Sequence, residues 1–472
     1  MNYRKMYTHF VVILLVVAVV VIACKKNDDT DSSGSGSASV STLTCASVTY
    51  SATATVNVAY SGTATVPYTG GNGATYSAGS AISSTGVTGL TATLVANTLA
   101  SGAGSIVYNI SGTPASAGTA SFAISFGSQS CTLSLTVNSA STSATDCSSL
   151  TGIAKVVCAA NNFLSTLSSS QQSSVILTLN LTNAKRWSNL PCALSCRNGL
   201  LFSSLSSAQL DAAKAVIQAA AGTASGEGYD EFLTITAADD YLGLSANGYS
   251  SGNYIIAFLG TPSTTGKWML QYGGHHFAAN ITYDAGKVVS ITPLHEGVEP
   301  HGSFTLNGTI YPSPLASELE VMQNMLGALS STELSGAKIS GSFSDVLMVP
   351  GSTTNTFPST KQGIKVGTLS ADVQAKVKAA IAAWVNDVDD SSATAYLATY
   401  ESELANTYIC YASNTSAKAG DASSFFTSNT DYVRIDGPSV WIEFICQNGV
   451  VISNQIHYHT VMRDHNRDYI GL

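Results

Sequence analysis

The sequence contains few charged residues for its size. Asp, Glu, Lys and Arg make up only 10% of the 472 residues, and the formal net charge of −9 is mild for that length. Because no stripe of basic residues is present to neutralise phosphates, the sequence argues against a nucleic-acid-binding protein. Abundant Ser, Thr, Ala and Gly favour an exported, turn-rich protein over a cytosolic enzyme. A hydrophobic content of 45% allows a substantial core, and the length predicts two folded domains plus an export segment.

The apolar run near the N-terminus is too short for a typical membrane-spanning helix. It covers Phe10–Ala23, which is 14 residues, and Cys24 follows directly. A short apolar run that ends in V-I-A-C resembles the signal peptide and lipobox of bacterial lipoproteins, which implies cleavage before Cys24 and a lipid anchor on its sulfur. An uncleaved anchor helix is the alternative. Lys25 and an acidic tether favour the outer membrane, with exposure at the cell surface, and the tether contains Asp28, Asp29 and Asp31.

The remaining cysteines are even in number, which in an exported chain predicts disulfides. Four of these cysteines are paired because they lie close in the sequence. The other four are then paired as two disulfides that close longer loops. A metal or redox pair is the alternative for C-A-L-S-C, but no second cysteine pair at zinc-ligand spacing accompanies it. The predicted disulfides are Cys147 with Cys158, Cys192 with Cys196, Cys45 with Cys131, and Cys410 with Cys446.

Changes in composition divide the chain into segments. A signal peptide at 1–24 and a flexible tether at 25–40 precede a region at 41–138 of short Val, Thr, Tyr and Ala runs with period-two alternation, which predicts a small all-β sandwich. Its S-S-T-G-V-T-G-L-T-A-T-L and Q-S-C-T-L-S-L-T-V runs resemble the Ig-like repeats of bacterial surface adhesins. A single copy favours a spacer. A linker at 139–146 leads to a larger domain at 147–472.

The larger domain alternates helical and strand-like patterns, which predicts an α+β fold of antiparallel sheets with packed helices. Four Leu-Ser pairs precede helical runs, and three of these have Gln or Glu three residues after the serine, as in a capping box. Helices are expected at 169–179, 207–221, 228–243, 315–329, 331–338, 371–388 and 392–406. Strands are expected as one meander at 253–259, 267–272, 276–283 and 287–292, and a second at 408–411, 432–435, 440–447 and 450–461.

Histidines are concentrated in three short stretches, which hold seven of the eight. His457 and His459 are two positions apart on a predicted strand, so they share a face at roughly 6 to 7 Å and can converge on one metal ion. His275 and His276 are adjacent and point to opposite faces, so only one can join them, and the more polar face favours His276. A set of buried, hydrogen-bonded histidines that holds two sheets together is the alternative. Additional candidate ligands are His295, His301 and Glu299.

Two local patterns near these histidines limit the geometry. His295 and Glu296 begin like a zinc-protease helix, but no histidine follows at the required position, and Gly297 and Pro300 forbid a regular helix. Further on, Asn448-Gly449 predicts a two-residue hairpin. That register places His457 opposite Val440 and puts Glu443 on the other face from the histidine pair.

Other polar residues are candidates for the same site. Arg463 shares strand parity with His457 and His459, so it could bind an anionic group or stabilise developing negative charge, and Asp464 follows it as a second catalytic candidate. Asp464, Asp468 or Glu299 could orient ligands. Trp187, Asn189 and Arg197 belong to a loop that Pro191 keeps out of a helix, so they could form the rim of a cleft, and a plug over the core is the alternative.

Several motifs resemble a bacterial family catalogued as domain of unknown function 3500. They are R-W-S-N-L-P at 186–191, R-N-G-L at 197–200, Q-Y-G-G-H-H at 271–276 and H-Y-H-T-V-M-R-D at 457–464, the last followed by R-D-Y at 467–469. The resemblance covers roughly residues 150–472. It brings no established activity. Its typical pattern has G-G-H-H and H-x-H, which fall here on His275, His276, His457 and His459.

Two functions follow from these patterns. In the first, His457, His459 and one histidine of the G-G-H-H turn hold zinc or copper with an open position, as in a hydrolase or oxidase that acts on a small or anionic substrate. In the second, a surface lipoprotein binds a small ligand or captures metal without turnover, with a pocket lined by Trp187, Trp268, Tyr272 and Trp441. An open coordination position beside a cleft would distinguish the enzyme from the binding protein.

Overall fold

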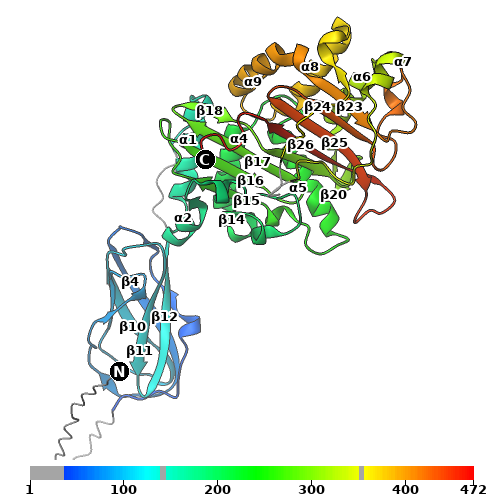
Figure 1. Cartoon of the computed structure of the whole chain (residues 1–472). Coiled ribbons are helices and arrows are strands. Elements are labelled where there is room, and N and C mark those ends of the chain that lie inside the picture. Colours follow the sequence, from blue (N-terminus) through cyan, green and yellow to red (C-terminus); the bar gives the residue numbers. More distant parts are fainter. Residues whose placement is uncertain (1–36, 139–144, 350–355) are drawn as a thin grey trace, which may run out of the picture.

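The computed structural model describes residues 37–138, 145–349 and 356–472 (Figure 1). The expected signal peptide, the lipidation site at Cys24 and most of the tether lie outside the described residues, as does most of the linker. Among the described residues, none of the helices combines the length and the apolar character that a membrane span requires.

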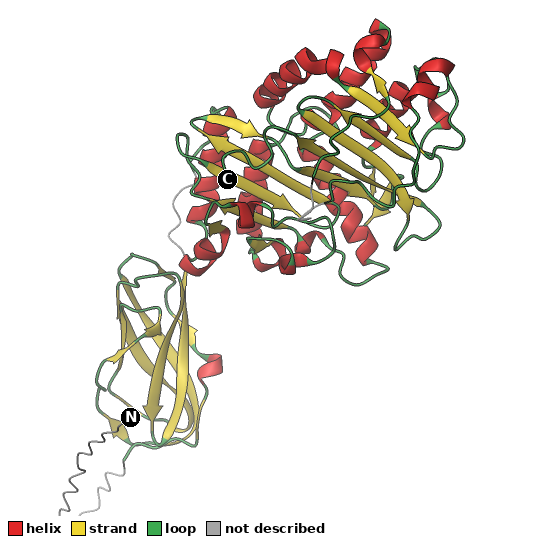
Figure 2. Cartoon of the chain, viewed as in Figure 1, coloured by secondary structure: helices red, strands yellow, loops and turns green. Residues whose placement is uncertain are grey.

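The N-terminal region is built almost entirely from strands (Figure 2). A six-stranded sheet has the order β1-β4-β10-β8-β6 with β2 beside β4, a four-stranded sheet has the order β3-β12-β11-β7, and β5 pairs with β9. Buried and exposed residues alternate along the longer strands, as the sequence predicted, and both sheets contribute to one core. The strands are β1 (Thr42–Leu43), β2 (Thr49–Tyr50), β3 (Ala54–Thr55), β4 (Tyr60–Asn72), β5 (Thr75–Tyr76), β6 (Ile82–Ser83), β7 (Thr85–Gly86), β8 (Leu90–Leu94), β9 (Asn97–Thr98), β10 (Ser101–Gly112), β11 (Gly118–Phe126) and β12 (Gln129–Asn138).

The C-terminal region contains one 12-stranded sheet in place of two separate meanders. Its order is β13-β15-β16-β17-β19-β26-β25-β24-β23-β22, with β14 beside β15 and β18 beside β17. The strand β19 (Leu294–Val298) pairs with β17 on one side and β26 on the other, and so joins the two halves. The other strands are β13 (Ile176–Leu177), β14 (Leu200–Leu201), β15 (Ile255–Leu259), β16 (Trp268–Gly273), β17 (Phe277–Asp284), β18 (Lys287–Ser290), β22 (Ile364–Lys365), β23 (Tyr408–Ala412), β24 (Tyr432–Asp436), β25 (Val440–Asn448) and β26 (Ile456–Asp464), and β20 (Phe304–Leu306) pairs with β21 (Thr309–Tyr311) apart from this sheet.

Helices begin where the capping patterns predicted. Ser168, Ser206 and Ser330 each form a complete capping box, and Ser370 caps its helix through its side chain alone. The first helix, α1, had no such signal and was not predicted. The helices are α1 (Gly152–Ser165), α2 (Ser169–Val175), α3 (Leu181–Ala184), α4 (Ser207–Ala220), α5 (Tyr229–Gly243), α6 (Ala316–Gly327), α7 (Ser331–Ala337), α8 (Ala371–Val385) and α9 (Asp390–Glu403).

The two faces of β26 contact different parts of the chain. On one face, Thr460 accepts a hydrogen bond at 2.9 Å from the indole of Trp384 in α8. On the other face, Val461 packs against Val346 and Met348 from the loop after α7. The histidines of β26 lie on this second face because they share the parity of Val461.

The predicted two-residue hairpin between β25 and β26 is wrong. Asn448 pairs with Ile456, so the loop covers 449–455, and His457 lies opposite Gln447. Glu299, from outside the hairpin, accepts the backbone N–H of Val451 at 3.0 Å and holds this longer loop. A tertiary contact has thus overridden the local Asn-Gly signal.

The new register moves Glu443 to the histidine face, contrary to the expectation. Glu443 lies opposite Val461 and therefore shares its face. Its carboxylate accepts hydrogen bonds from the backbone N–H of Leu347 at 2.7 Å, the hydroxyl of Tyr432 at 2.8 Å and the indole of Trp441 at 2.8 Å. Both carboxylate oxygens of Glu443 therefore accept hydrogen bonds that hold the loop over this face.

Three of the four predicted disulfides are present, namely Cys45–Cys131, Cys147–Cys158 and Cys192–Cys196. The fourth prediction is wrong because Cys410 and Cys446 are buried free thiols. Cys410 lies in β23 and Cys446 in β25, with β24 between them. Alternate strands are about 9 to 10 Å apart, which is beyond the reach of a disulfide.

Candidate metal centre

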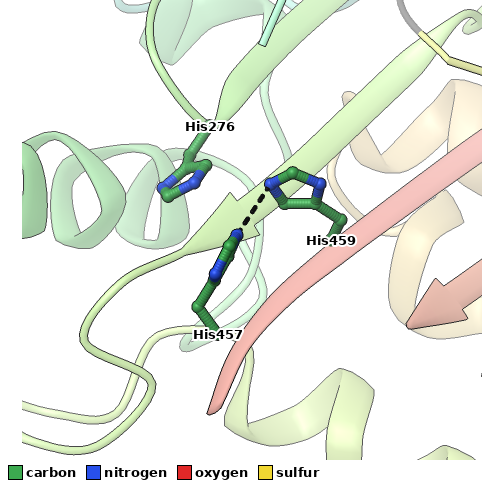
Figure 3. A group of neighbouring side chains, drawn as sticks. All are labelled: His276, His457 and His459. Carbon is green, nitrogen blue, oxygen red and sulfur yellow. Dashed lines mark hydrogen bonds between the residues drawn. The ribbon is translucent and has the colours of Figure 1, made fainter. Parts of the chain in front are cut away.

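Three histidine rings meet where the two halves of the large sheet join (Figure 3). His457 and His459 come from β26, and His276 comes from the turn before β17. The Nε2 atoms of His457 and His459 lie 3.1 Å apart. One ring nitrogen from each of the three histidines lies within 4.8 Å of the others, so one metal ion could contact all three. The structure thus brings the strand pair together with one histidine of the G-G-H-H turn.

The strand β19 leaves room for these rings where it passes them. Gly297 lies opposite His459 in the pairing of β19 with β26. A Cβ atom at Gly297 would lie 2.9 Å from Cδ2 of His459 and 3.1 Å from Cδ2 of His276. Both distances are shorter than ordinary contacts, so any larger residue would displace the rings. The glycine is therefore a packing requirement of the centre.

The turn that carries His276 is held by the loop of the W-S-N-L-P motif. His276 has a φ of +64°, and its backbone N–H donates to the carbonyl of Asn189 at 3.0 Å. Arg197 donates from Nη2 to the carbonyls of Gly274 at 2.6 Å and of Ser188 at 2.8 Å. These bonds fix a left-handed conformation that histidine seldom adopts. The loop therefore determines where the His276 ring points.

The three loop residues expected at the rim of a cleft are buried instead. Trp187, Asn189 and Arg197 are at most 4% exposed. Trp187 donates its indole N–H to the hydroxyl of Tyr469 at 2.8 Å. The Arg197 guanidinium is occupied by backbone carbonyls, and burial lowers its pKa to about 10. Packing and positioning are thus the roles that the geometry gives these residues.

Two acceptors fix the orientation of the strand histidines. His457 Nδ1 lies 2.7 Å from the carbonyl oxygen of Asn448, and His459 Nδ1 lies 2.9 Å from Oδ1 of Asp345. A carbonyl oxygen or a carboxylate can only accept, so each Nδ1 carries the proton. The Nε2 atoms of the two rings point away from these acceptors and face each other. This arrangement resembles metal-bound histidines whose other nitrogen donates to an acceptor.

Burial lowers the pKa of the His276 and His457 rings, which keeps both uncharged. Burial, and then the neighbouring His459, lowers the pKa of His457 to about 3. Burial, and then His275, lowers the pKa of His276 well below its usual range. The pKa of Asp345 is raised by burial but lowered more by the hydrogen bond and charge of His459, so it lies below its ordinary value. Neutral rings at His276 and His457 and an ionised carboxylate at Asp345 are protonation states that suit a metal centre.

His275 supports the centre from behind and is not in the group of three. Its Nδ1 lies 2.6 Å from Oδ1 of Asp239, a residue of α5. Its ring stacks on that of His276 at a centroid distance of 3.7 Å. The ring of Tyr249 meets it from another side at 4.8 Å. His275 therefore restrains the His276 ring.

Of the three additional candidate ligands, His295 lies next to the histidine centre, whereas His301 and Glu299 make other contacts. His295 is fully buried, and its ring lies 5.3 Å from that of His459. Among the described residues, neither ring nitrogen of His295 has a hydrogen-bond partner of normal geometry, and burial lowers its pKa to about 3. His301 Nδ1 instead lies 2.6 Å from the carbonyl of Ile456, and Glu299 holds the loop before β26.

The two catalytic candidates do not lie with the three histidines. Arg463 donates from Nε to Asp468 at 2.6 Å, and at four residues beyond His459 on a strand it is about 13 Å away. Asp464 lies on the opposite face, where it accepts a hydrogen bond from the hydroxyl of Tyr400 at 2.8 Å. Both residues hold the end of β26 in place.

Sequence reasoning missed the residues that orient the rings. Asp239 lies in α5 among the buried residues Ile235, Ala238 and Leu242, and an acid at this apolar spacing was a signal that could have been used. Asp345 lies in an irregular loop with no spacing to mark it. Asn448 contributes its backbone carbonyl, which no side-chain pattern reveals. A second group of candidate ligands, Glu227, Glu231 and Asp387, was also missed.

The comparisons place the chain in a family without a described activity. No curated protein matches it, and no solved structure matches it. The family described as "Protein of unknown function (DUF3500)" matches residues 150–471, which include the three histidines, the W-S-N-L-P loop and β19. Because the match covers more than half of the sequence, the chain belongs to the DUF3500 family.

Proposed function

We propose that this chain is a metal-dependent enzyme with a zinc or copper centre at His276, His457 and His459. The observation that carries the proposal is the distance of 3.1 Å between the Nε2 atoms of His457 and His459, whose Nδ1 atoms both face acceptors. A cation between two such Nε2 atoms would stabilise them, and the low pKa of His457 disfavours a proton on that ring. With metal bonds of about 2.0 to 2.1 Å, neighbouring ligand nitrogens are about 2.9 to 3.4 Å apart.

Three protein ligands favour a catalytic centre over a structural one. Structural zinc sites are closed by four protein ligands, whereas catalytic sites keep a position for water or substrate. A bound zinc would supply Lewis acidity for hydrolysis, and a copper ion would support oxygen chemistry. His276, His457 and His459 are at most 7% exposed, which favours a small substrate. Three neutral ligands leave most of the ionic charge uncompensated, which favours an anionic group.

Asp345 is the residue of this chain best placed to control the centre. Its carboxylate holds the Nδ1 proton of His459, and its side chain is 32% exposed, so it marks the solvent side. By holding this proton, Asp345 keeps the Nε2 lone pair of His459 directed at the metal position and raises its basicity. Asn448 does the same for His457 through a neutral acceptor.

One observation favours a second candidate function, capture of a metal without turnover. The unpartnered ring nitrogens of His295 lie beside His459, on the same face of the sheet. If that ring turned towards His459, it would supply a fourth ligand and close the centre. A closed site of four histidines would store or transport a metal, because no position would remain for substrate.

The cell envelope is the proposed location. The lipobox ending at Cys24 supports a lipoprotein of the outer membrane, exposed at the surface. The three disulfides support an exported protein, because disulfides form and persist in oxidising compartments. The N-terminal all-β region would then act as an Ig-like spacer between the membrane and the metal centre.

Metal analysis of protein purified without a histidine tag tests the centre. We expect one zinc or copper ion per chain in the wild type and none in His459→Ala. His465→Ala is the matched control, because His465 follows β26 but contacts Asp436 outside the centre. A wild type without stoichiometric metal would overturn the proposal.

His295→Ala separates the enzyme from the capture protein. An open centre keeps its metal and its exchangeable water when His295 is removed, and the water is visible in the magnetic resonance of the copper-loaded protein. A closed centre loses affinity by at least about tenfold and shows no exchangeable water in the wild type.

A further inference from the structure

A second group of side chains gathers on the helix-covered face of the sheet, across β19 from the histidines. Glu296 lies between His295 and Gly297 on β19 and therefore points to the opposite face. Four carboxylates there are at most 4% exposed, and the group of five, which we call the acidic cluster, comprises Glu227, Glu231, Glu296, Glu318 and Asp387.

Three segments supply the centre of the acidic cluster. Glu231 belongs to α5, Glu227 precedes it, and Asp387 follows α8. Each of these three residues places one carboxylate oxygen within 4.8 Å of the others. Glu296 approaches from the sheet and Glu318 from α6, close enough for their charges to act on the same group.

The acidic cluster has no counter-charge. None of the ion pairs among the described residues includes any of the five carboxylates. With the carboxylates ionised, both oxygens of Glu231, both of Glu296, one of Glu227 and one of Asp387 are buried without a hydrogen-bond donor, and protonation would let Glu231 and Glu296 bond to Asp387. Burying a carboxylate without a donor or counter-charge costs several kcal/mol. Glu296 adds an independent observation, because its fully buried, unpartnered side chain enters the group from another element.

The backbone is shaped to bring these groups together. A Cβ atom at Gly222 would lie 1.8 Å from the carbonyl oxygen of Asn386, so only glycine allows this close approach. Gly222 donates its N–H to the carbonyl of Asp387 at 2.9 Å, and Gly228 donates to Oδ1 of Asp387 at 2.8 Å. These contacts place the segment before α5 against the end of α8, and so place Glu227 beside Asp387.

A cavity of about 480 Å³ connects Glu231 with the surface. Asp230 and Ser317 also line it, and both are polar. The cavity therefore brings solvent to one member of the acidic cluster, and a small movement of Glu231 would open a path for a cation.

We propose that the acidic cluster is a second metal site, which binds a hard divalent cation of the calcium class through Glu227, Glu231 and Asp387, with Glu296 and Glu318 beside them. Only oxygen donors are present, and these suit calcium, magnesium or manganese, not copper. Calcium bonds of about 2.3 to 2.6 Å allow ligand oxygens on opposite sides of the ion to be up to about 5.2 Å apart, so three oxygens within 4.8 Å of one another fit this ion. The site is separate from the proposed enzyme centre and does not depend on its activity.

Direct calcium binding to the full chain tests the proposal. After removal of metals by a chelator, equilibrium dialysis against radioactive calcium should show one saturable site in the wild type. Calcium should also raise the midpoint of thermal unfolding by several degrees beyond an equal ionic strength of sodium chloride. Glu231→Gln and Asp387→Asn should weaken calcium binding at least about a hundredfold, because each removes a charged ligand while keeping the shape of the side chain.

Two variants keep the test specific. Glu320→Gln removes an exposed acid of α6, two residues from Glu318, and should leave calcium binding unchanged. His459→Ala should also keep it, since the histidine centre lies on the other face. If the chelated wild type shows no saturable calcium binding, or if Glu320→Gln weakens it as much as Glu231→Gln does, the proposal is wrong and shared protons hold the acidic cluster together.

Discussion

Adjacent residues of β19 face two kinds of polar cluster. His295 and Gly297 face imidazoles, and Glu296 between them faces carboxylates. On the histidine side, Asn448 and Asp345 orient the rings before any metal arrives. On the acidic side, most oxygens have no donor while the carboxylates are ionised, so either protons or a cation must satisfy them. One strand thus separates the proposed nitrogen site for zinc or copper from the proposed oxygen site for calcium.

The largest expected effect is that a ligand substitution on one side removes the metal of that side and leaves the other metal bound. We expect His459→Ala to lose zinc or copper but keep calcium, and Glu231→Gln to lose calcium but keep zinc or copper. Each variant removes one ligand from one face of the sheet, and the strand between them is unchanged. Elemental analysis of the same two samples measures both metals. Loss of both metals in either variant would show that the faces are not independent.

The acidic side should give the metal-free protein a distinct dependence on pH. Burial, and then the charge of Glu227, raises the pKa of Asp387 from 3.8 to about 7, and burial, and then Glu296, raises the pKa of Glu231 well above its usual range. A carboxyl with a raised pKa binds its proton more tightly in the folded state than in the unfolded state, so proton binding stabilises the fold. This contribution to the free energy of unfolding is fully present below about pH 4 and is lost as pH rises towards 7. We expect a loss of a few kcal/mol in the free energy of unfolding.

Chemical denaturation in the presence of a chelator measures this loss. The measurement is made on the His459→Ala variant, because in the wild type the chelator would also remove metal from the histidine centre. Calcium should abolish the loss, since the cation replaces the protons. Glu231→Gln should reduce it. A free energy of unfolding that is flat between pH 5 and pH 7 in the chelator would show that the carboxylates have another source of stabilisation.

Gly297→Ala should disturb the histidine side alone. The added Cβ would meet both His459 and His276, so we expect zinc affinity to fall at least about a hundredfold and stability to fall by about 1 to 3 kcal/mol. Calcium affinity should stay within about twofold, since the glycine faces away from the acidic cluster. Gly302→Ala is the control, because a Cβ there meets nothing within 4 Å. Competition with a coloured chelator measures the zinc affinity.

The smallest effect is expected from Asp345→Asn. The amide can still accept from Nδ1 of His459 but removes the negative charge, so zinc affinity should fall by about tenfold to a hundredfold. Asp372→Asn, at an exposed acid of α8, should change nothing. Equal affinities in Asp345→Asn and the wild type would show that the ring of His459 is oriented by packing alone.

The sequence predicted those elements of the fold that are determined by interactions between residues close in the chain. The capping boxes at Ser168, Ser206 and Ser330 start their helices as expected, because the cap bonds are made within four residues. Strand parity put His457 and His459 on one face for the same reason. Three disulfides followed from closeness and from pairing the remainder.

Contacts between distant segments decided what the sequence did not reveal. The strand β19 was missed because L-H-E-G-V is buried on both faces and therefore shows no alternation. The β25–β26 register depends on Glu299, a residue outside the hairpin. The acidic cluster draws on α5, α6, β19 and the end of α8, and each acid by itself resembles an ordinary surface residue of its element. Only the assembled fold shows that these acids are buried together.

The central position of β19 also determines when the metal sites can form during folding. His276 belongs to one half of the sheet and His459 to the other, and in the sheet formed by the described residues β19 lies between these halves. The long-range pairing of β19 with β17 and β26 must therefore precede the histidine centre, and the same strand delivers Glu296 to the acidic cluster. Metals bound at both sites would favour the native state and leave the folding transition state largely unchanged. We expect them to slow the unfolding of the sheet without speeding its formation.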